Sequence, residues 1–304
     1  MPHSPHIMLS LVLIFIASLF FSGLISRTKS ILSGRKGPGI FQPLKDVARL
    51  LRKGTVYPAT CSFIYRMAPV VYFASVVAAI LTVPFNGLSG ILSFQYDFVF
   101  FAYILSLGKF FCIIAAMDTG SSFEGMGASR EALYSMLAEP AFFLVLGSLG
   151  LLSCNNSFVD IFSHIDFSST QALVLGIVAA IILTILNMIE NSRLPLDDPK
   201  THLELTMIHE VMILDYSGVD LALIHITGYL KFALYAALVA NIFIPLARSF
   251  IGAVALFVAI QALSAIIIGV IESFYARYRM NHNPEFIFAL TAVAFLVIFS
   301  TFCF

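Results

Sequence analysis

Long apolar runs recur along the chain and are separated by short polar stretches. A membrane-spanning helix needs about 20 consecutive apolar residues, because each residue adds about 1.5 Å and the hydrocarbon layer is about 30 Å thick. Eight runs reach that length, near residues 7–26, 67–85, 95–117, 132–152, 171–190, 219–246, 250–274 and 285–303. The pattern predicts an all-α polytopic membrane protein with one integral membrane domain over residues 1–304.

Basic residues gather in one connection between predicted spans, residues 27–66. It carries nine of the 17 Lys and Arg residues. Loops rich in Lys and Arg stay on the cytoplasmic side of a membrane, so we expect this connection to be cytoplasmic and both termini to lie outside. No basic region precedes the run at 7–26 and no small-residue cleavage site follows it, so it predicts a retained first span rather than a signal peptide.

Composition supports the membrane assignment and narrows the functions. Hydrophobic residues make up 60% of the chain, against roughly 45–50% in an average soluble domain. The 17 acidic and 17 basic residues cancel, which argues against nucleic acid as a partner. No CxxC pair occurs, which argues against an iron-sulfur cluster or structural zinc held by this chain alone; the cysteines are Cys61, Cys112, Cys154 and Cys303.

Motifs for metal binding and catalysis are also missing from the sequence. His202 and His209 stand seven residues apart, whereas the HExxH zinc motif places its histidines four apart on one helix face. The sequence contains neither a phosphate-binding glycine loop nor a nucleophile elbow. We therefore predict no metal site, no cofactor and no autonomous catalysis in this chain.

Lys109, Glu139 and Lys231 lie well inside predicted spans. A charge at the centre of a bilayer costs roughly 2.5 to 3.5 kcal/mol, so each of these residues should face protein or water and have a partner. For the two lysines, a functional role and a buried structural ion pair both stay open. Glu139 precedes Pro140, which favours a helix kink, and the depth of its carboxyl favours a proton relay over structural pairing.

The stretch DTGSSFEGMGASREALYSMLAEP, residues 118–140, contains the second cytoplasmic segment. Its first half is rich in Gly and Ser and predicts a loop, with Ser129 as the N-cap of a helix that enters the membrane at about Leu133. Glu131, Ser135 and Glu139 follow at intervals of four residues, which places them close to one face of that helix.

The stretch IENSRLPLDDPKTHLELTMIHE, residues 189–210, contains the third cytoplasmic segment. Glu190 ends the fifth predicted span, and Pro195 and Pro199 then force a turning path. From Thr201 we predict a second surface helix with polar side chains available to water or a partner, namely Glu204, His209 and Glu210.

The first cytoplasmic segment contains SGRKGPGIFQPLKDVARLLRKGTVYP, residues 33–58. Its glycines and prolines predict a turn, followed by an amphipathic helix along the membrane surface with the apolar stripe Leu44, Val47, Ala48 and Leu51. Such basic surface helices often do nothing but bind anionic headgroups. The alternative is that Arg35, Lys36 and the helix dock a soluble partner.

These motifs carry a resemblance to a known family. ENSRLPLDDPKTHLEL, followed by HEVMILDYSG, resembles the signature region of the respiratory complex I subunit 1 family. The segment at 118–140 is more similar to the membrane subunits of energy-converting nickel-iron hydrogenases, of the formate hydrogenlyase or hydrogenase-4 component C type. Complex I proteins have an acidic residue after the second proline where this chain has Lys200, Thr201 and His202, which argues against a quinone chamber.

The resemblance implies a non-catalytic anchor and proton-coupling subunit of an oxidoreductase complex in a prokaryotic inner membrane. Implied partners are hydrogenase-like large and small subunits, a ferredoxin-like iron-sulfur subunit and antiporter-like membrane subunits; iron-sulfur clusters and a nickel-iron centre would lie in these partners. The residues expected to couple protons are Lys109, Asp118, Glu131, Glu139, Glu190 and Lys231. Those expected to dock the redox arm are Arg35, Lys36, Arg130, Arg193, Asp197, Asp198, Glu204 and Glu210.

Two other functions remain open from the sequence. The first is a quinone-chamber subunit of a complex I-like NADH or ferredoxin dehydrogenase. The second is a stand-alone ion-coupled transporter that uses Lys109, Glu139 and Lys231 as its ion path. Inverted repeats are typical of such transporters, and the two halves of this sequence show no convincing similarity.

Overall fold

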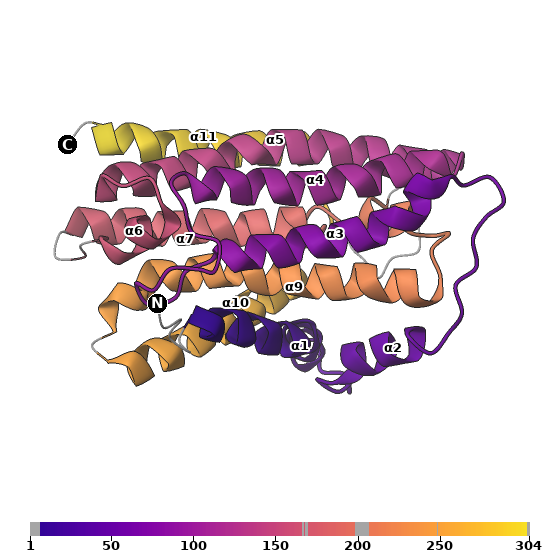
Figure 1. Cartoon of the computed structure of the whole chain (residues 1–304), viewed down its shortest axis with the longest axis horizontal. Coiled ribbons are helices and arrows are strands. Elements are labelled where there is room, and N and C mark those ends of the chain that lie inside the picture. The colour runs from indigo at the N-terminus through magenta and orange to yellow at the C-terminus, as the bar shows by residue number, and fades with distance from the viewer. Residues whose placement is uncertain (1–6, 166, 168–169, 198–206, 248, 303–304) are drawn as a thin grey trace.

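The computed structural model describes residues 7–165, 167, 170–197, 207–247 and 249–302, and its regular elements within these ranges are helices (Figure 1). Eight helices are long and apolar enough to cross a membrane, which confirms the predicted fold class and number of spans. These are α1 (Ile7–Leu32), α3 (Phe63–Thr82), α4 (Asp97–Asp118), α5 (Ser122–Ser153), α7 (Thr170–Glu190), α9 (Gly218–Phe243), α10 (Phe250–Phe274) and α11 (His282–Phe302). The shorter elements are α2 (Gln42–Leu50), α6 (Phe158–Ser163), α8 (His209–Met212) and the 3-10 turn η1 (Ile244–Leu246).

Helices α3, α4, α5, α7 and α9 run side by side along the long axis of the molecule, whereas α1 is tilted away from it (Figure 1). Helix α9 lies at the centre of the bundle. Helix α9 packs against α1, α3, α7 and α10, so 78% of the residues in its most apolar stretch are buried. Helix α11 packs mainly on α5 at the periphery, and only 22% of the residues in its most apolar stretch are buried. Polar side chains on α9 are therefore surrounded by protein.

Helices α3 and α4 approach each other closely because Gly108 offers no side chain at their contact. A Cβ at that position would overlap the Ser75 hydroxyl and would lie 3.1 Å from the Tyr72 ring. Small residues allow helix backbones to come close together in membranes, where van der Waals packing and interhelical hydrogen bonds stabilise the association. This contact places Lys109, the next residue along α4, beside the centre of the bundle.

The start of the helix that contains the fourth span was predicted wrongly. Helix α5 begins at Ser122, eight residues before the start that an N-cap at Ser129 implies, and its N-cap is Ser121. The Gly- and Ser-rich segment is helical because α8 packs on it, and Gly127 lies at this contact beside Val211 and the carbonyl of Ile208. Tertiary packing outweighs the low helix propensity of glycine here.

The two predicted surface helices have different outcomes. Helix α2 covers Gln42–Leu50 and contains three of the four predicted stripe residues, which confirms the first. Most of the first half of the second lies outside the described residues, and the described part is helical only at α8, His209–Met212. Residues 207–208 and 213–217 lie outside this helix, so the predicted second surface helix is not continuous over the described residues.

Candidate functional site

A charged network lies between α4, α5, α7 and α9 and centres on Glu190, the last residue of α7. Lys109 of α4 donates to Glu190 Oε2 at 2.8 Å, and Lys231 of α9 donates to the same oxygen at 2.7 Å. Lys231 also donates to the Glu190 backbone carbonyl at 2.8 Å. The expectation that both intramembrane lysines have partners is confirmed.

Helix α5 supplies the second carboxylate of this network. Glu131 Oε1 lies 3.1 Å from the Lys109 ammonium, and Ser135, one turn further on, accepts a hydrogen bond from the same ammonium at 2.8 Å. Ser192 donates to the other Glu131 oxygen at 3.3 Å. Two ammonium groups therefore face two carboxylates, and this balance offsets the large cost of removing each charge from water.

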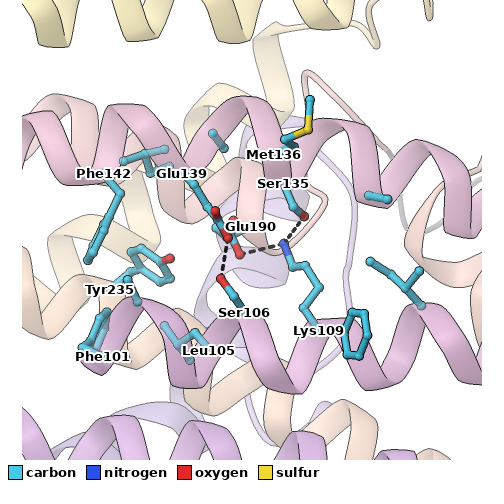
Figure 2. Close-up of a pocket in the computed structure, with 16 residues that line it drawn as sticks. Phe101, Leu105, Ser106, Lys109, Ser135, Met136, Glu139, Phe142, Glu190 and Tyr235 are labelled. Atoms are coloured by element: carbon cyan, nitrogen blue, oxygen red, sulfur yellow. Dashed lines mark hydrogen bonds and ion pairs between the residues drawn. The ribbon is translucent and has the colours of Figure 1, made fainter. Parts of the chain in front are cut away.

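A cavity of about 280 Å³ opens beside the network, between α4 and α5 (Figure 2). Glu139 points into it, and the Ser106 hydroxyl donates to Glu139 Oε1 at 2.5 Å. Phe110 and Met136 on its rim are 54% and 66% exposed, so the cavity reaches the outer surface of the bundle. We call it the lateral cavity.

A smaller cavity of about 70 Å³ also borders Glu190 and is called the inner cavity. Its lining includes His209, Glu210 and His225, and Glu190 borders both cavities. Burial lowers the pKa of His209 to about 4, although the Glu131 carboxylate acts in the opposite direction. His209 is therefore neutral at pH 7 and can accept or donate a proton through its ring nitrogens.

The structure places Glu139, Glu131, Glu190, Lys109 and Lys231 in or beside this network, but not Asp118. Asp118 Oδ2 accepts a hydrogen bond from the backbone N–H of Ser62 at 2.6 Å, which fixes the start of α3. Asp118 thus connects the end of α4 to the start of α3.

The residues predicted to dock a redox arm are distributed over several contacts. Arg130 donates to the Met207 carbonyl at 3.0 Å, and Glu210 borders the inner cavity. Arg35 and Lys36 line a different cavity, at the C-terminal ends of α1 and α10. Asp198 and Glu204 lie outside the described residues.

Two of the predicted docking residues are anchored by internal ion pairs. Asp197 is buried, lies 3.0 Å from the Arg277 guanidinium, and accepts the Ile208 backbone N–H at 2.9 Å. Arg193 lies 3.5 Å from Glu272 and stacks over the Phe232 ring. These contacts order the turn after α7 and hold it against α8, α9 and α10.

Glu272, Ser106 and Glu124 contribute to the polar interior but were not singled out from the sequence. Glu272 and Glu124 are 4% and 1% exposed. Glu272 lies within the predicted span 250–274, so the criterion that singled out Lys109 applies to it equally. Ser106 shows no comparable signal, because serine is common in membrane helices. Among the described residues no group of three or more His, Cys, Asp or Glu side chains could hold a metal ion.

Fold and site together define a multi-pass membrane protein with a charge-balanced polar core bordered by two cavities. The sequence matches the family model described as NADH dehydrogenase over residues 6–302. The chain therefore belongs to the NADH dehydrogenase family, as the resemblance at residues 189–218 and 118–140 predicts.

Individual relatives agree with this assignment. The chain is 28% identical to formate hydrogenlyase subunit 4 of Escherichia coli K12, over 96% of both chains. It is 27% identical to hydrogenase-4 component C of the same strain, over 78% of this chain and 74% of the relative. It is 30% identical to a subunit of the NADH-quinone oxidoreductase of Burkholderia vietnamiensis, over 69% of this chain and 61% of the relative.

A solved structure shows the same fold. It belongs to a chain in the membrane-bound sulfane sulfur reductase, an archaeal respiratory membrane complex. The two folds agree with a TM-score of 0.74 over 96% of this chain and 99% of the other, at 18% sequence identity. The fold is thus shared at low sequence identity.

Proposed function

We propose that this chain is the membrane-anchor and proton-coupling subunit of a membrane-bound hydrogenase-like oxidoreductase of the formate hydrogenlyase type. The observation that carries the proposal is the position of Glu190, which borders both cavities and binds two lysines through one oxygen. Similarity to formate hydrogenlyase subunit 4 over 96% of both chains supports the type of complex.

The geometry supports transfer of a proton through a change in ion pairing. A proton that reaches Glu190 from the inner cavity neutralises its carboxylate and weakens its hold on Lys109 and Lys231. Lys109 keeps Glu131 and Ser135 as partners. The two lysines then carry more positive charge than the remaining carboxylate balances. This excess favours release of a proton from the network toward the lateral cavity, where Glu139 is the next carboxylate.

The inner end of the bundle is the proposed docking surface for the redox arm. It contains the starts of α3 and α5, the turn after α7 and helix α8. Hydrogenase-like large and small subunits and a ferredoxin-like subunit would bind there and hold the iron-sulfur clusters and nickel-iron centre, while antiporter-like subunits would bind within the membrane. We place the complex in a prokaryotic inner membrane with this end facing the cytoplasm, because residues 27–66 carry nine basic residues.

The test is the Glu139→Gln variant, expressed with its partner subunits in inverted membrane vesicles. Glutamine keeps the shape of the side chain but cannot carry a transferred proton, so we expect proton uptake to fall by about tenfold or more while electron transfer and assembly persist. Glu285→Gln is the control, because Glu285 is exposed and pairs only with His282 among the described ion pairs. Unchanged proton uptake in Glu139→Gln would remove Glu139 from the path.

A quinone-chamber function is the second candidate, because the NADH-quinone oxidoreductase relative is 30% identical over 69% of this chain. The inner cavity measures about 70 Å³, whereas small-molecule sites usually measure about 300–1,000 Å³. This difference favours the hydrogenase-like function. Inhibition of electron transfer by a quinone-site inhibitor in the assembled complex would reverse that preference.

A further inference from the structure

A third cavity, of about 510 Å³, lies at the inner ends of α1 and α10 and is called the basic cavity. Residues 33 and 35–38, which follow α1, form part of its lining together with Ser26 and Ser30. Three basic side chains also line it, namely Lys29, Arg35 and Lys36. It is separate from the network around Glu190, with which it shares none of its lining residues.

The charge inside the basic cavity is not balanced. Its carboxylate, Glu272, is 4% exposed and lies 3.1 Å from Lys29 and 3.5 Å from Arg193. Arg35 and Lys36 are exposed, and neither takes part in an ion pair among the described residues. The cavity therefore has surplus positive charge and two cationic side chains that can reach an anion.

Apolar surface continues from the basic cavity along both helices. On α1, Phe15 and Leu19 precede Ser26 by 11 and seven residues, share its helix face, and are 38% and 43% exposed. On α10, Ile266 precedes Ser273 by seven residues and is 40% exposed. Phe274, on the lining itself, is 75% exposed.

Helix geometry places the basic cavity at the depth of lipid headgroups. Leu19 lies at the middle of α1 (Ile7–Leu32), and Lys29 lies ten residues, or about 15 Å of helix, further along. This distance equals half the thickness of the hydrocarbon layer, so Lys29 lies near the layer's edge when the middle of α1 lies at its centre. A ligand with its charge between Arg35 and Lys36 can thus lay an apolar tail along α1 and α10. Basic recesses between membrane helices on the cytoplasmic side are suited to acidic lipids.

We propose that the basic cavity binds the phosphate of an anionic phospholipid, whose acyl chains lie on the exposed apolar faces of α1 and α10. The exposed apolar surface favours a lipid over free phosphate, because free phosphate has no apolar part that could cover this surface. This site is distinct from the proposed proton path, so either proposal can fail without the other.

The experiment measures lipid binding to the purified, delipidated complex by native mass spectrometry. The probes are phosphatidylglycerol, cardiolipin and phosphatidylcholine, with inorganic phosphate as competitor. We expect wild type to retain phosphatidylglycerol and cardiolipin but not phosphatidylcholine, and Arg35→Gln/Lys36→Gln to bind both anionic lipids about tenfold or more weakly. The control Arg52→Gln/Lys53→Gln removes two exposed charges of the same connection outside the cavity and should change the affinity by less than twofold.

Three results would overturn the proposal. Equal losses in the two double variants would mean that the lipid responds to overall charge and not to this cavity. Complete displacement of lipid by millimolar inorganic phosphate would show that the cavity binds free phosphate rather than a lipid. Loss of binding in Arg35→Lys/Lys36→Arg, which keeps both charges, together with an altered melting curve would assign these side chains to folding.

Discussion

At the scale of single residues, Glu190 connects three helices through one charge. Lys109 comes from α4 and Lys231 from α9, and both ammonium groups bind the same oxygen of this α7 residue. Buried ion pairs add little net stability, since the charges lose hydration, but removal of one partner leaves a buried charge without compensation. The network is therefore sensitive to charge imbalance more than to the loss of any one contact.

This sensitivity leads to a prediction for Lys231, whose side chain is 1% exposed. Lys231→Met leaves the network one positive charge short, and we expect the free energy of unfolding to fall by roughly 3–5 kcal/mol. Lys231→Met combined with Glu190→Gln restores the balance and should recover most of that loss. Thermal melting followed by circular dichroism in detergent measures both. A double variant as unstable as the single one would contradict charge balance as the cause.

His209 gives the protein a second property at the residue scale, a dependence of stability on pH. Its pKa is lowered to about 4 in the fold, against about 6.5 in the unfolded chain, so the unfolded state binds the proton more readily. Its stabilising contribution is complete above about pH 6.5 and declines as the pH falls toward 4. We expect His209→Gln to flatten the fall in melting temperature between pH 7.5 and 5. His282→Gln, at an exposed position, should leave that fall unchanged.

At the scale of elements, the apolar pattern could predict the spans but not where α5 begins. A span is specified by about 20 local residues, so each of the eight could be predicted from its own stretch of sequence. The first ten residues of α5 are helical because α8, more than 80 residues later, packs on them. Contacts between such distant segments leave no periodic signal within either one. Ser129 therefore looked like an N-cap although it lies in the helix interior.

The contact between α5 and α8 can be tested with two glycines of the same helix. A Cβ at Gly127 would lie 2.8 Å from the Ile208 carbonyl and 3.0 Å from Met212 Cγ, whereas a Cβ at Gly125 would meet nothing within 4 Å. We expect Gly127→Ala to destabilise the protein by about 1–3 kcal/mol, because overpacking displaces α8. Gly125→Ala should be neutral or stabilising by up to about 1 kcal/mol, since alanine favours helix. Equal melting temperatures would show that α8 moves away without cost.

At the scale of the whole molecule, the site arises from the way the helices assemble. Spacing within one helix could predict that Glu131, Ser135 and Glu139 share a face, because residues four apart always do. It could not predict that Lys109 and Lys231, 122 positions apart in the sequence, meet at Glu190. Asp118 was predicted to couple protons together with these glutamates, yet in the structure its carboxylate accepts the Ser62 backbone N–H and fixes the start of α3. Burial and partners across helices decide the role of each carboxylate.

Orientation in the membrane is the last prediction at this scale, and two natural cysteines can test it. Cys61 precedes α3 and Cys154 follows α5, and these two helices begin at the same end of the bundle, so the two thiols lie at opposite ends (Figure 1). Because the connection 27–66 is proposed to be cytoplasmic, a membrane-impermeant maleimide should label Cys154 in right-side-out vesicles and Cys61 in inverted ones.

The labelling needs a background in which Cys112 and Cys303 are replaced by Ser, with Cys61→Ser and Cys154→Ser as separate controls. Cys154 is exposed, so its reaction should be the faster of the two. Burial raises the pKa of the half-buried Cys61 thiol, which reduces its thiolate fraction and slows its reaction, so labelling at pH 8.5 for longer times is required. The opposite labelling pattern would show that the protein has the reverse orientation in the membrane, with α8 and the inner cavity on the side away from the cytoplasm.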